Sequence, residues 1–273
     1  MSTETAARGT LVKIVRTEAT PVVDGDLREW PASGWQRIPL APALEDDQKN
    51  RTGDIEIDLQ AVVTANRLYV AVRWPDPTLD DSHRPWLRQG GRYRRGKARD
   101  DMFALRLHKS GDFDRSMLAT HAYSVDVWLW SAGRSNHAGL AEDWMHIISP
   151  DPIENAAEHG LPGGGSVYIR KIADGGEPIY RFVKPSRTST ESQVESVALS
   201  TKASESQADV AARGRWRDGH WHLELARDLD TGHDDDVQLV SGQAVLGQVA
   251  VFNQGYAGHK SVSEPLRFEM AIR

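Results

Sequence analysis

The sequence predicts an all-β sandwich with an immunoglobulin-like outline, long loops and a few short helices. Apolar residues recur at every second position in many short segments, which is the pattern of strands with one buried face. Gly, Pro and Asp separate these segments at short intervals, and convincing long amphipathic helices are scarce. Strands that follow strands in this way bury their apolar faces by packing as two sheets.

The strands are expected in a definite order along the chain. IEIDLQAVVTA and NRLYVAVRW, which together cover residues 55–74, form a hairpin that turns at Asn66. Residues 212–227 form a second hairpin, which turns at Asp218-Gly219 because this dipeptide suits a tight turn. Single strands are expected at 102–108, 122–132, 166–172, 244–253 and 266–272.

Three segments stand outside this scaffold. Residues 1–18 are expected to form an N-terminal extension. Residues 84–99, RPWLRQGGRYRRGKAR, hold seven basic residues and no acidic one, and are expected to form a loop. Residues 186–206 hold ten Ser or Thr among 21 residues and are expected to be a second long loop or an arm. Short helical turns are expected near 142–147 and 152–159, and the 273 residues are interpreted as one domain.

The composition excludes several classes of site. The net charge of −6 disfavours bulk binding of nucleic acid. The chain contains no cysteine, which excludes disulfides, iron–sulfur clusters, thiolate zinc sites, cysteine nucleophiles and covalently attached c-type haem. No nucleophile elbow, phosphate loop or dinucleotide fingerprint occurs, and the glycines at 163–165 are read as an isolated turn. The sequence therefore contains no catalytic motif of these classes.

Targeting signals are also lacking. MSTETAARGTLVKIV has neither the apolar core of a signal peptide nor a twin arginine. No window approaches the roughly 20 apolar residues that a membrane helix needs. We therefore expect a chain without a membrane span and without an export signal of its own.

Several strings carry a resemblance to a known family. PVVDGDLREWPASGW has a VDG-x-x-x-x-W pattern, which occurs in sandwich domains similar to family 9 carbohydrate-binding modules (CBM9) and in haem b subunits of ethylbenzene dehydrogenase-like molybdenum enzymes. RDDMFALRL, DVWLWSAGRSN, AEDWMH and VAVFNQGYAGHKSVS are similar to the second group. The chain thus resembles the gamma subunits of dehydrogenases for ethylbenzene and dimethyl sulfide and of selenate and chlorate reductases, with a CBM9-like sandwich as the implied fold.

The resemblance implies one non-covalent haem b with a methionine and a lysine as axial ligands of the iron. Met102 matches the methionine, because it follows two aspartates at the start of a strand. Lys260 matches the lysine, because it precedes Ser-Val-Ser near the C-terminus. The same resemblance makes Trp128, Trp130 and Arg134 candidates for the wall and rim of the haem pocket.

These ligand types suit electron transfer. A thioether is a soft ligand that favours ferrous iron and raises the reduction potential. A lysine amine ligates only when neutral, so the iron must compete with a proton whose usual pKa is about 10.4. Burial helps, because removal from water disfavours the ammonium form. We expect both ligands to lie at strand ends or in adjoining loops, between the edges of the two sheets.

The resemblance also implies partners. A molybdopterin catalytic subunit carries out the substrate chemistry, an iron–sulfur subunit relays electrons between that site and the haem of this chain, and an external cytochrome or similar redox partner exchanges them. The implied location is the periplasm, reached by co-export with a partner that carries the signal. A cytoplasmic complex is the alternative.

Other residues offer alternative sites. His259 lies beside Lys260, and Met145 in DWMH is the reserve thioether. His220 and His222 lie two apart on one strand face, but no carboxylate or third ligand is near them in sequence, which disfavours zinc. The stretch from 228 to 236, DLDTGHDDD, resembles a calcium loop only loosely and is read as a solvated turn.

Two other functions remain open at this point. One is a carbohydrate-binding module-like sandwich without haem, in which some of the nine tryptophans would stack on sugar rings. The other is an interaction subunit whose haem site has decayed. The basic residues 84–99 have three interpretations: a solvated loop, a docking patch for an acidic redox partner, or a cover for the haem propionates.

Overall fold

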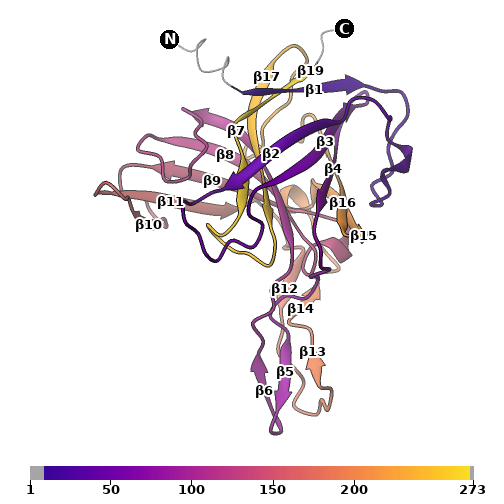
Figure 1. The fold of residues 1–273 in the computed structure, drawn as a ribbon, viewed down its shortest axis with the longest axis vertical. Helices are drawn as coiled ribbons and strands as arrows, with labels where there is room; N and C mark the ends of the chain where they lie inside the picture. The colour runs from indigo at the N-terminus through magenta and orange to yellow at the C-terminus, as the bar shows by residue number, and fades with distance from the viewer. Residues whose placement is uncertain (1–8, 271–273) are drawn as a thin grey trace.

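The computed structural model describes residues 9–270, and it confirms the predicted all-β sandwich (Figure 1). Three short 3-10 helices occur within this range, η2 (Leu27–Glu29), η3 (Asn136–Ala138) and η4 (Glu205–Ala208). The strands are, in chain order, β1 (Thr10–Arg16), β2 (Gln36–Pro42), β3 (Ile55–Val63), β4 (Arg67–Pro75), β5 (Trp86–Gln89), β6 (Arg92–Arg95), β7 (Met102–Gly111), β8 (Tyr123–Ser131), β9 (Glu142–Ser149), β10 (Ala157–Gly160), β11 (Ser166–Ala173), β12 (Tyr180–Phe182), β13 (Gln193–Val194), β14 (Val197–Leu199), β15 (Ala211–Arg217), β16 (His220–Asp228), β17 (Ala244–Phe252), β18 (Ser261–Ser263) and β19 (Leu266–Met270).

One hydrogen-bonded ladder folds over itself to make the two layers. Its order is β10-β11-β9-β8-β7-β17-β18-β2-β3-β4-β16-β15, and β1 links β19 to β3. The main core lies between the layer of β7 and β8 and the layer of β3, β4 and β16. Trp74, Trp130 and Trp221 meet there with ring centres 5.0–6.3 Å apart, and each is at most 2% exposed. Burial of such large apolar surfaces is the main source of stability for this sandwich.

Three sequence-based expectations about local structure are wrong. Residues 142–147 lie in β9, which pairs with β8 on one side and β11 on the other. Residues 157–159 lie in β10, which pairs with β11, and residues 152–156 contain a turn at Glu154–Asn155 and no helix. Residues 1–18 are not simply an extension, because Thr10–Arg16 forms β1, which runs parallel to both β19 and β3. Residues 1–8 lie outside the described range. Tertiary pairing decides these segments, since each has only weak periodicity of its own.

The first segment predicted as a loop, 84–99, and most of the second, 186–206, belong to an ordered arm, which we define as residues 84–99 and 180–200. β5 and β6 form a hairpin that turns at Gly90 and Gly91, whose positive φ angles of 56° and 77° match a two-residue turn of this kind. β13 adds to β5, and β12 pairs with β14 at the base. The arm projects from one end of the sandwich, at the bottom of Figure 1. Between residues 9 and 270 no helix has the length and hydrophobicity needed to cross a bilayer.

Candidate functional site

A cavity of about 500 Å³ lies on the outer face of the layer that contains β7 and β8. Side chains alternate across a strand, so Met102, Ala104 and Arg106 of β7 face this cavity while Phe103 and Leu105 face the main core. The same alternation lines the cavity with residues of β9, β11 and β17. The volume falls within the roughly 300–1,000 Å³ that small-molecule and cofactor pockets occupy. The cavity therefore lies on the outside of the sandwich and not between the edges of its two sheets.

The loops around β7 and β18 close the cavity. Residues 115–118, in the connection between β7 and β8, line one side, and residues 255–258 before β18 line another. Apolar side chains from the strands form most of the remaining wall, among them Val127, Leu129 and Phe252. An apolar, partly enclosed cavity of this kind excludes water from a bound molecule.

Trp128 and Trp130 do not line the cavity, contrary to expectation. Both are 0% exposed and point from β8 into the core, on the face opposite Val127 and Leu129. Trp128 covers the guanidinium of Arg227 at 4.7 Å from its ring centre. Adjacent positions on a strand face opposite sides, so the residues that line the cavity had to be Val127 and Leu129.

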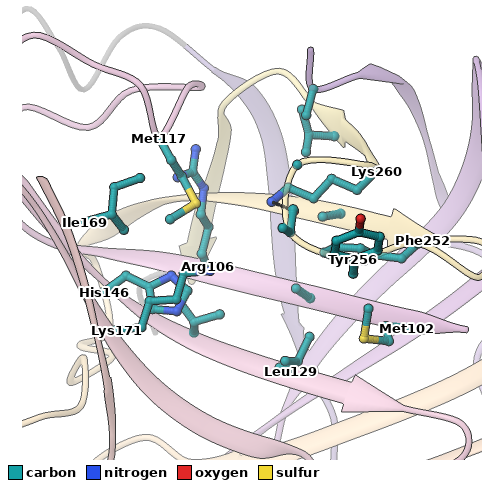
Figure 2. A pocket seen from close by; sticks show the side chains of 18 of the residues that line it. Met102, Arg106, Met117, Leu129, His146, Ile169, Lys171, Phe252, Tyr256 and Lys260 are labelled. Carbon is teal, nitrogen blue, oxygen red and sulfur yellow. Dashed lines mark hydrogen bonds between the residues drawn. The ribbon is translucent and has the colours of Figure 1, made fainter. Parts of the chain in front are cut away.

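Met102 and Lys260 line the same cavity, and Phe252 connects them. Met102 is directly opposite Phe252 in the ladder between β7 and β17, so the two side chains share one face. Lys260 immediately precedes β18, and β18 pairs with β17 on the edge of β17 that faces away from β7. Its Nζ atom lies 5.2 Å from the centre of the Phe252 ring. Two strand spacings separate Met102 from Lys260, or about 10 Å between Cα atoms. Figure 2 shows both side chains on the wall of the cavity.

The amine of Lys260 has an unusual environment for a lysine. It donates a hydrogen bond to the carbonyl oxygen of Ala257 at 3.0 Å, and it forms no ion pair with a described carboxylate. Burial, together with the positive charges of Arg106 and Lys171, lowers the pKa of Lys260 to about 7. A substantial fraction of neutral amine is thus available near neutral pH.

The thioether of Met102 is held in place by Arg134. A guanidinium nitrogen of Arg134 contacts Sδ of Met102, and the side chain of Met102 is 7% exposed. Arg134 is itself fixed by Asp100, whose Oδ2 accepts a hydrogen bond from Nε at 3.0 Å. Burial opposes ionisation of Asp100, but a hydrogen bond with His83 and the charge of Arg134 together lower its pKa. Arg134 therefore lines the cavity with its charge already neutralised.

Two cations that the sequence analysis missed lie at the other end of the cavity. Arg106 is buried, and its guanidinium donates to the carbonyl oxygens of Asp114 and Arg115 at 2.6 Å and to the hydroxyl of Tyr123. Its Nε has no hydrogen-bond partner among the described residues. Lys171 also lines the cavity, and its side chain is exposed. It forms no ion pair or hydrogen bond with any residue in the range 9–270. Figure 2 shows both cations on the side where Met117 lies.

His146 also lines the cavity at this end. Burial lowers the pKa of His146 well below its usual value, and the positive charges of Lys171, Lys260 and Arg106 act in the same direction. Its imidazole is therefore neutral near neutral pH. The alternation that starts at Met102 identifies Arg106 from sequence, whereas His146 and Lys171 require the pairing of β9 and β11, which a single sequence does not reveal.

The alternative ligands lie elsewhere. His259 does not line the cavity, because its Nδ1 is paired with Asp47 at 2.8 Å. Met145 is on the face of β9 opposite His146 and does not line the cavity. The second methionine that does line it is Met117. His220 and His222 do not belong to any group of potential metal ligands among residues 9–270. The acidic turn contributes Asp236 to a buried cluster that already contains the guanidinium of Arg227.

Comparison with known proteins gives a family match over most of the chain. The chain is similar to a carbohydrate binding module family 9 protein from Caldicellulosiruptor kristjanssonii in complex with glucose, with 9% identity, coverage of 97% of each chain and a TM-score of 0.42. For the complex of that organism's module with cellotriose, the identity is 10%, the coverage is 97% of this chain and 95% of that chain, and the TM-score is 0.41. No curated protein matches the sequence. The family model described as ethylbenzene dehydrogenase matches residues 28–262, so the chain belongs to the ethylbenzene dehydrogenase family.

Proposed function

We propose that the chain binds one non-covalent haem b in this cavity and transfers electrons through it, with Met102 and Lys260 as the axial ligands of the iron. The observation that carries the proposal is that a thioether and a lysine amine, 158 positions apart in the sequence, line one apolar cavity on either side of Phe252. A sulfur donor and a nitrogen donor of these types are known to serve as haem ligands or metal ligands.

The environment of Lys260 fits this role. A lysine that serves only to solubilise a surface keeps its charge and points to water or to a carboxylate. The amine of Lys260 instead faces the cavity without an ion pair, and its lowered pKa makes the neutral form accessible. Proton loss from the amine is the step that ligation requires, and burial reduces its cost.

The other end of the cavity fits the two carboxylates of haem b. Arg106 is buried without a carboxylate partner, and a buried charge without a counter-charge is costly. Lys171 is exposed and lies near Arg106 on the same side of the cavity. We assign these two side chains to the propionates, in place of Arg134, because the charge of Arg134 is already matched by Asp100.

Haem b supplies one-electron oxidation and reduction when bound, and two protein ligands leave its iron no open position for substrate. The residues of this chain would therefore bind and orient the group, keep water from it, and hold the sulfur of Met102 through Arg134. Substrate chemistry would belong to a molybdenum catalytic subunit, with an iron–sulfur subunit as the relay and an external cytochrome as the exchange partner. The family membership supports this division of labour. We place the complex in the periplasm, reached by co-export with a partner.

The visible spectrum of the purified full-length chain tests the proposal, with hemin added and a pyridine haemochrome assay to identify the haem type. The parent chain should give a sharp Soret band, a b-type α band and a low-spin ferric form. Met102→Ala and Lys260→Ala should each give a five-coordinate or haem-depleted protein. Met117→Ala and His146→Ala are matched controls from the same cavity, and both should keep the low-spin spectrum.

Two outcomes contradict the assignment. If Met102→Ala and Lys260→Ala both keep the parent spectrum, neither residue is a ligand. If His146→Ala abolishes the low-spin form while Lys260→Ala leaves it intact, the nitrogen ligand is the imidazole. A parent chain that takes up no hemin and binds soluble sugars would instead support the carbohydrate-binding alternative.

A further inference from the structure

The arm carries a charge opposite to that of the rest of the chain. Residues 84–99 and 180–200 contain ten Lys or Arg and two Glu, which gives the arm a net charge of +8. The whole chain has a net charge of −6, so everything outside the arm carries −14. Such a separation of charge creates a strong positive potential at the arm, which attracts acidic surfaces and repels basic ones.

The positive charges of the arm are not neutralised within the molecule. Two of them stack on aromatic rings: Arg95 on Trp86 at 5.1 Å, and Arg99 on Tyr256 at 3.9 Å from the ring centre. The other eight are exposed. Within residues 9–270, no ion pair involves any of the ten cations, which are Arg84, Arg88, Arg92, Arg94, Arg95, Lys97, Arg99, Arg181, Lys184 and Arg187.

The arm presents these charges on an ordered scaffold. β5 pairs with β6 from Trp86↔Arg95 to Gln89↔Arg92, and β13 pairs with the other edge of β5. Side chains tie the two segments of the arm together: the indole of Trp86 donates to the carbonyl oxygen of Val183 at 2.8 Å, and the hydroxyl of Tyr93 donates to that of Glu191 at 2.7 Å. A partner would therefore bind without ordering the backbone first, which lowers the cost of association.

We propose that the arm is a docking element for the aspartate- and glutamate-rich surface of another protein. An acidic patch on a globular protein is finite and fits an arm of limited extent. Duplex DNA and anionic membranes are stiff and extend beyond the arm, so they would also face the −14 remainder of the chain, whereas a finite acidic patch or a flexible carboxylate chain can contact the arm alone. Arg99, at the base of the arm, also lines the cavity, so the base of the arm adjoins the cavity. The proposal goes beyond electron transfer and does not depend on the cofactor.

Binding of labelled poly-L-glutamate to the full-length chain tests this, with duplex DNA and phosphatidylglycerol vesicles as phosphate-bearing probes. Poly-L-glutamate should bind more tightly than either. The double variant Arg92→Glu, Arg94→Glu should weaken this binding about tenfold, since it reverses two exposed, unpaired charges at the edge of the arm. The matched control, Lys13→Glu with Arg16→Glu, reverses two exposed charges on β1 at the opposite end of Figure 1 and should change it less than about twofold.

Three results would overturn the proposal. The first is equal weakening by the arm variant and the β1 variant, which would mean that net charge alone drives binding. The second is tighter binding to duplex DNA or to the vesicles, which would reassign the arm to a nucleic acid or a membrane. The third is no binding of poly-L-glutamate at low salt. Each readout needs no haem, so failure here is distinguishable from failure of the haem assignment.

Discussion

Arg227 lies at the centre of a fully buried cluster of charges in the core. Its guanidinium is 2.8 Å from Asp126, 2.8 Å from Asp236 and 3.4 Å from Asp143, and all four side chains are at most 1% exposed. Burial raises the pKa of Asp143 well above its usual value, and the neighbouring carboxylate of Asp126 raises it further. One cation thus stabilises three acids that water cannot reach, which makes the arginine indispensable to the cluster.

Replacement of Arg227 by Met should therefore destabilise the fold strongly. The variant keeps an apolar stem but leaves three buried acids without the cation that contacts them, so we expect a loss of about 3–5 kcal/mol in the free energy of unfolding. Urea denaturation followed by circular dichroism measures this loss. Arg215→Met is the control, because the pair of Arg215 with Asp24 at 3.4 Å is exposed and should cost less than about 1 kcal/mol. Similar losses in both variants would contradict the role of the buried cluster.

β15 packs closely against the Trp130 ring of β8, and Gly214 permits this close packing because it has no side chain. A Cβ atom at position 214 would lie 2.3 Å from the Trp130 ring. The amide of Gly214 donates to the side-chain oxygen of Asn136 at 2.8 Å, and the indole of Trp130 donates to the same oxygen at 3.0 Å. One asparagine therefore joins the two strands at a place where only glycine leaves room for the ring.

Gly214→Ala should force β15 or the Trp130 ring to move and should cost about 1–3 kcal/mol, the range for an overpacked core. Thermal unfolding by differential scanning calorimetry would show this as a lower Tm. Gly163→Ala provides the comparison, since a Cβ there meets nothing within 4 Å. An unchanged Tm for Gly214→Ala would mean that the two strands are more loosely packed than the distances imply.

The strands that the sequence predicts correctly are those with strong alternation and a clear turn. The hairpin over residues 55–74 corresponds to β3 and β4, and the hairpin over 212–227 to β15 and β16. β1, β9 and the strands of the arm were missed because their own patterns are weak and their partners are distant in sequence. Pairing between strands that are distant in sequence determines those elements, and such pairing cannot be predicted from a single sequence.

The residues of the candidate site likewise include some that the sequence identified and some that it did not. Met102 and Lys260 came from the family resemblance, and they line one cavity. Trp128 and Trp130 failed because proximity in sequence says nothing about which face of β8 a side chain occupies. Lys171 could be identified as a cavity residue only from the register between β9 and β11, which places it opposite His146.

At the scale of the whole molecule, the cavity links segments from distant parts of the chain. β7 begins at Met102, while β17 and β18 belong to the C-terminal part and contribute Phe252 and Lys260. A group that binds both segments is bound by the folded state and not by the unfolded chain. Binding should then stabilise the entire sandwich, because β7 and β17 are central strands of its ladder.

Hemin should accordingly raise the Tm of the chain in a concentration-dependent way. For one site, a free concentration a hundred times the Kd adds about 2.7 kcal/mol to the free energy of unfolding. Thermal unfolding at increasing hemin concentrations measures the effect. Met102→Ala should reduce the increment, because the variant weakens binding without opening the main core. Met145→Ala is the matched control, since that side chain lies outside the cavity, and it should keep the full increment even if its own Tm is lower. A Tm that does not respond to hemin would contradict the proposal that this cavity holds haem, because a ligand that binds only the folded state must stabilise it.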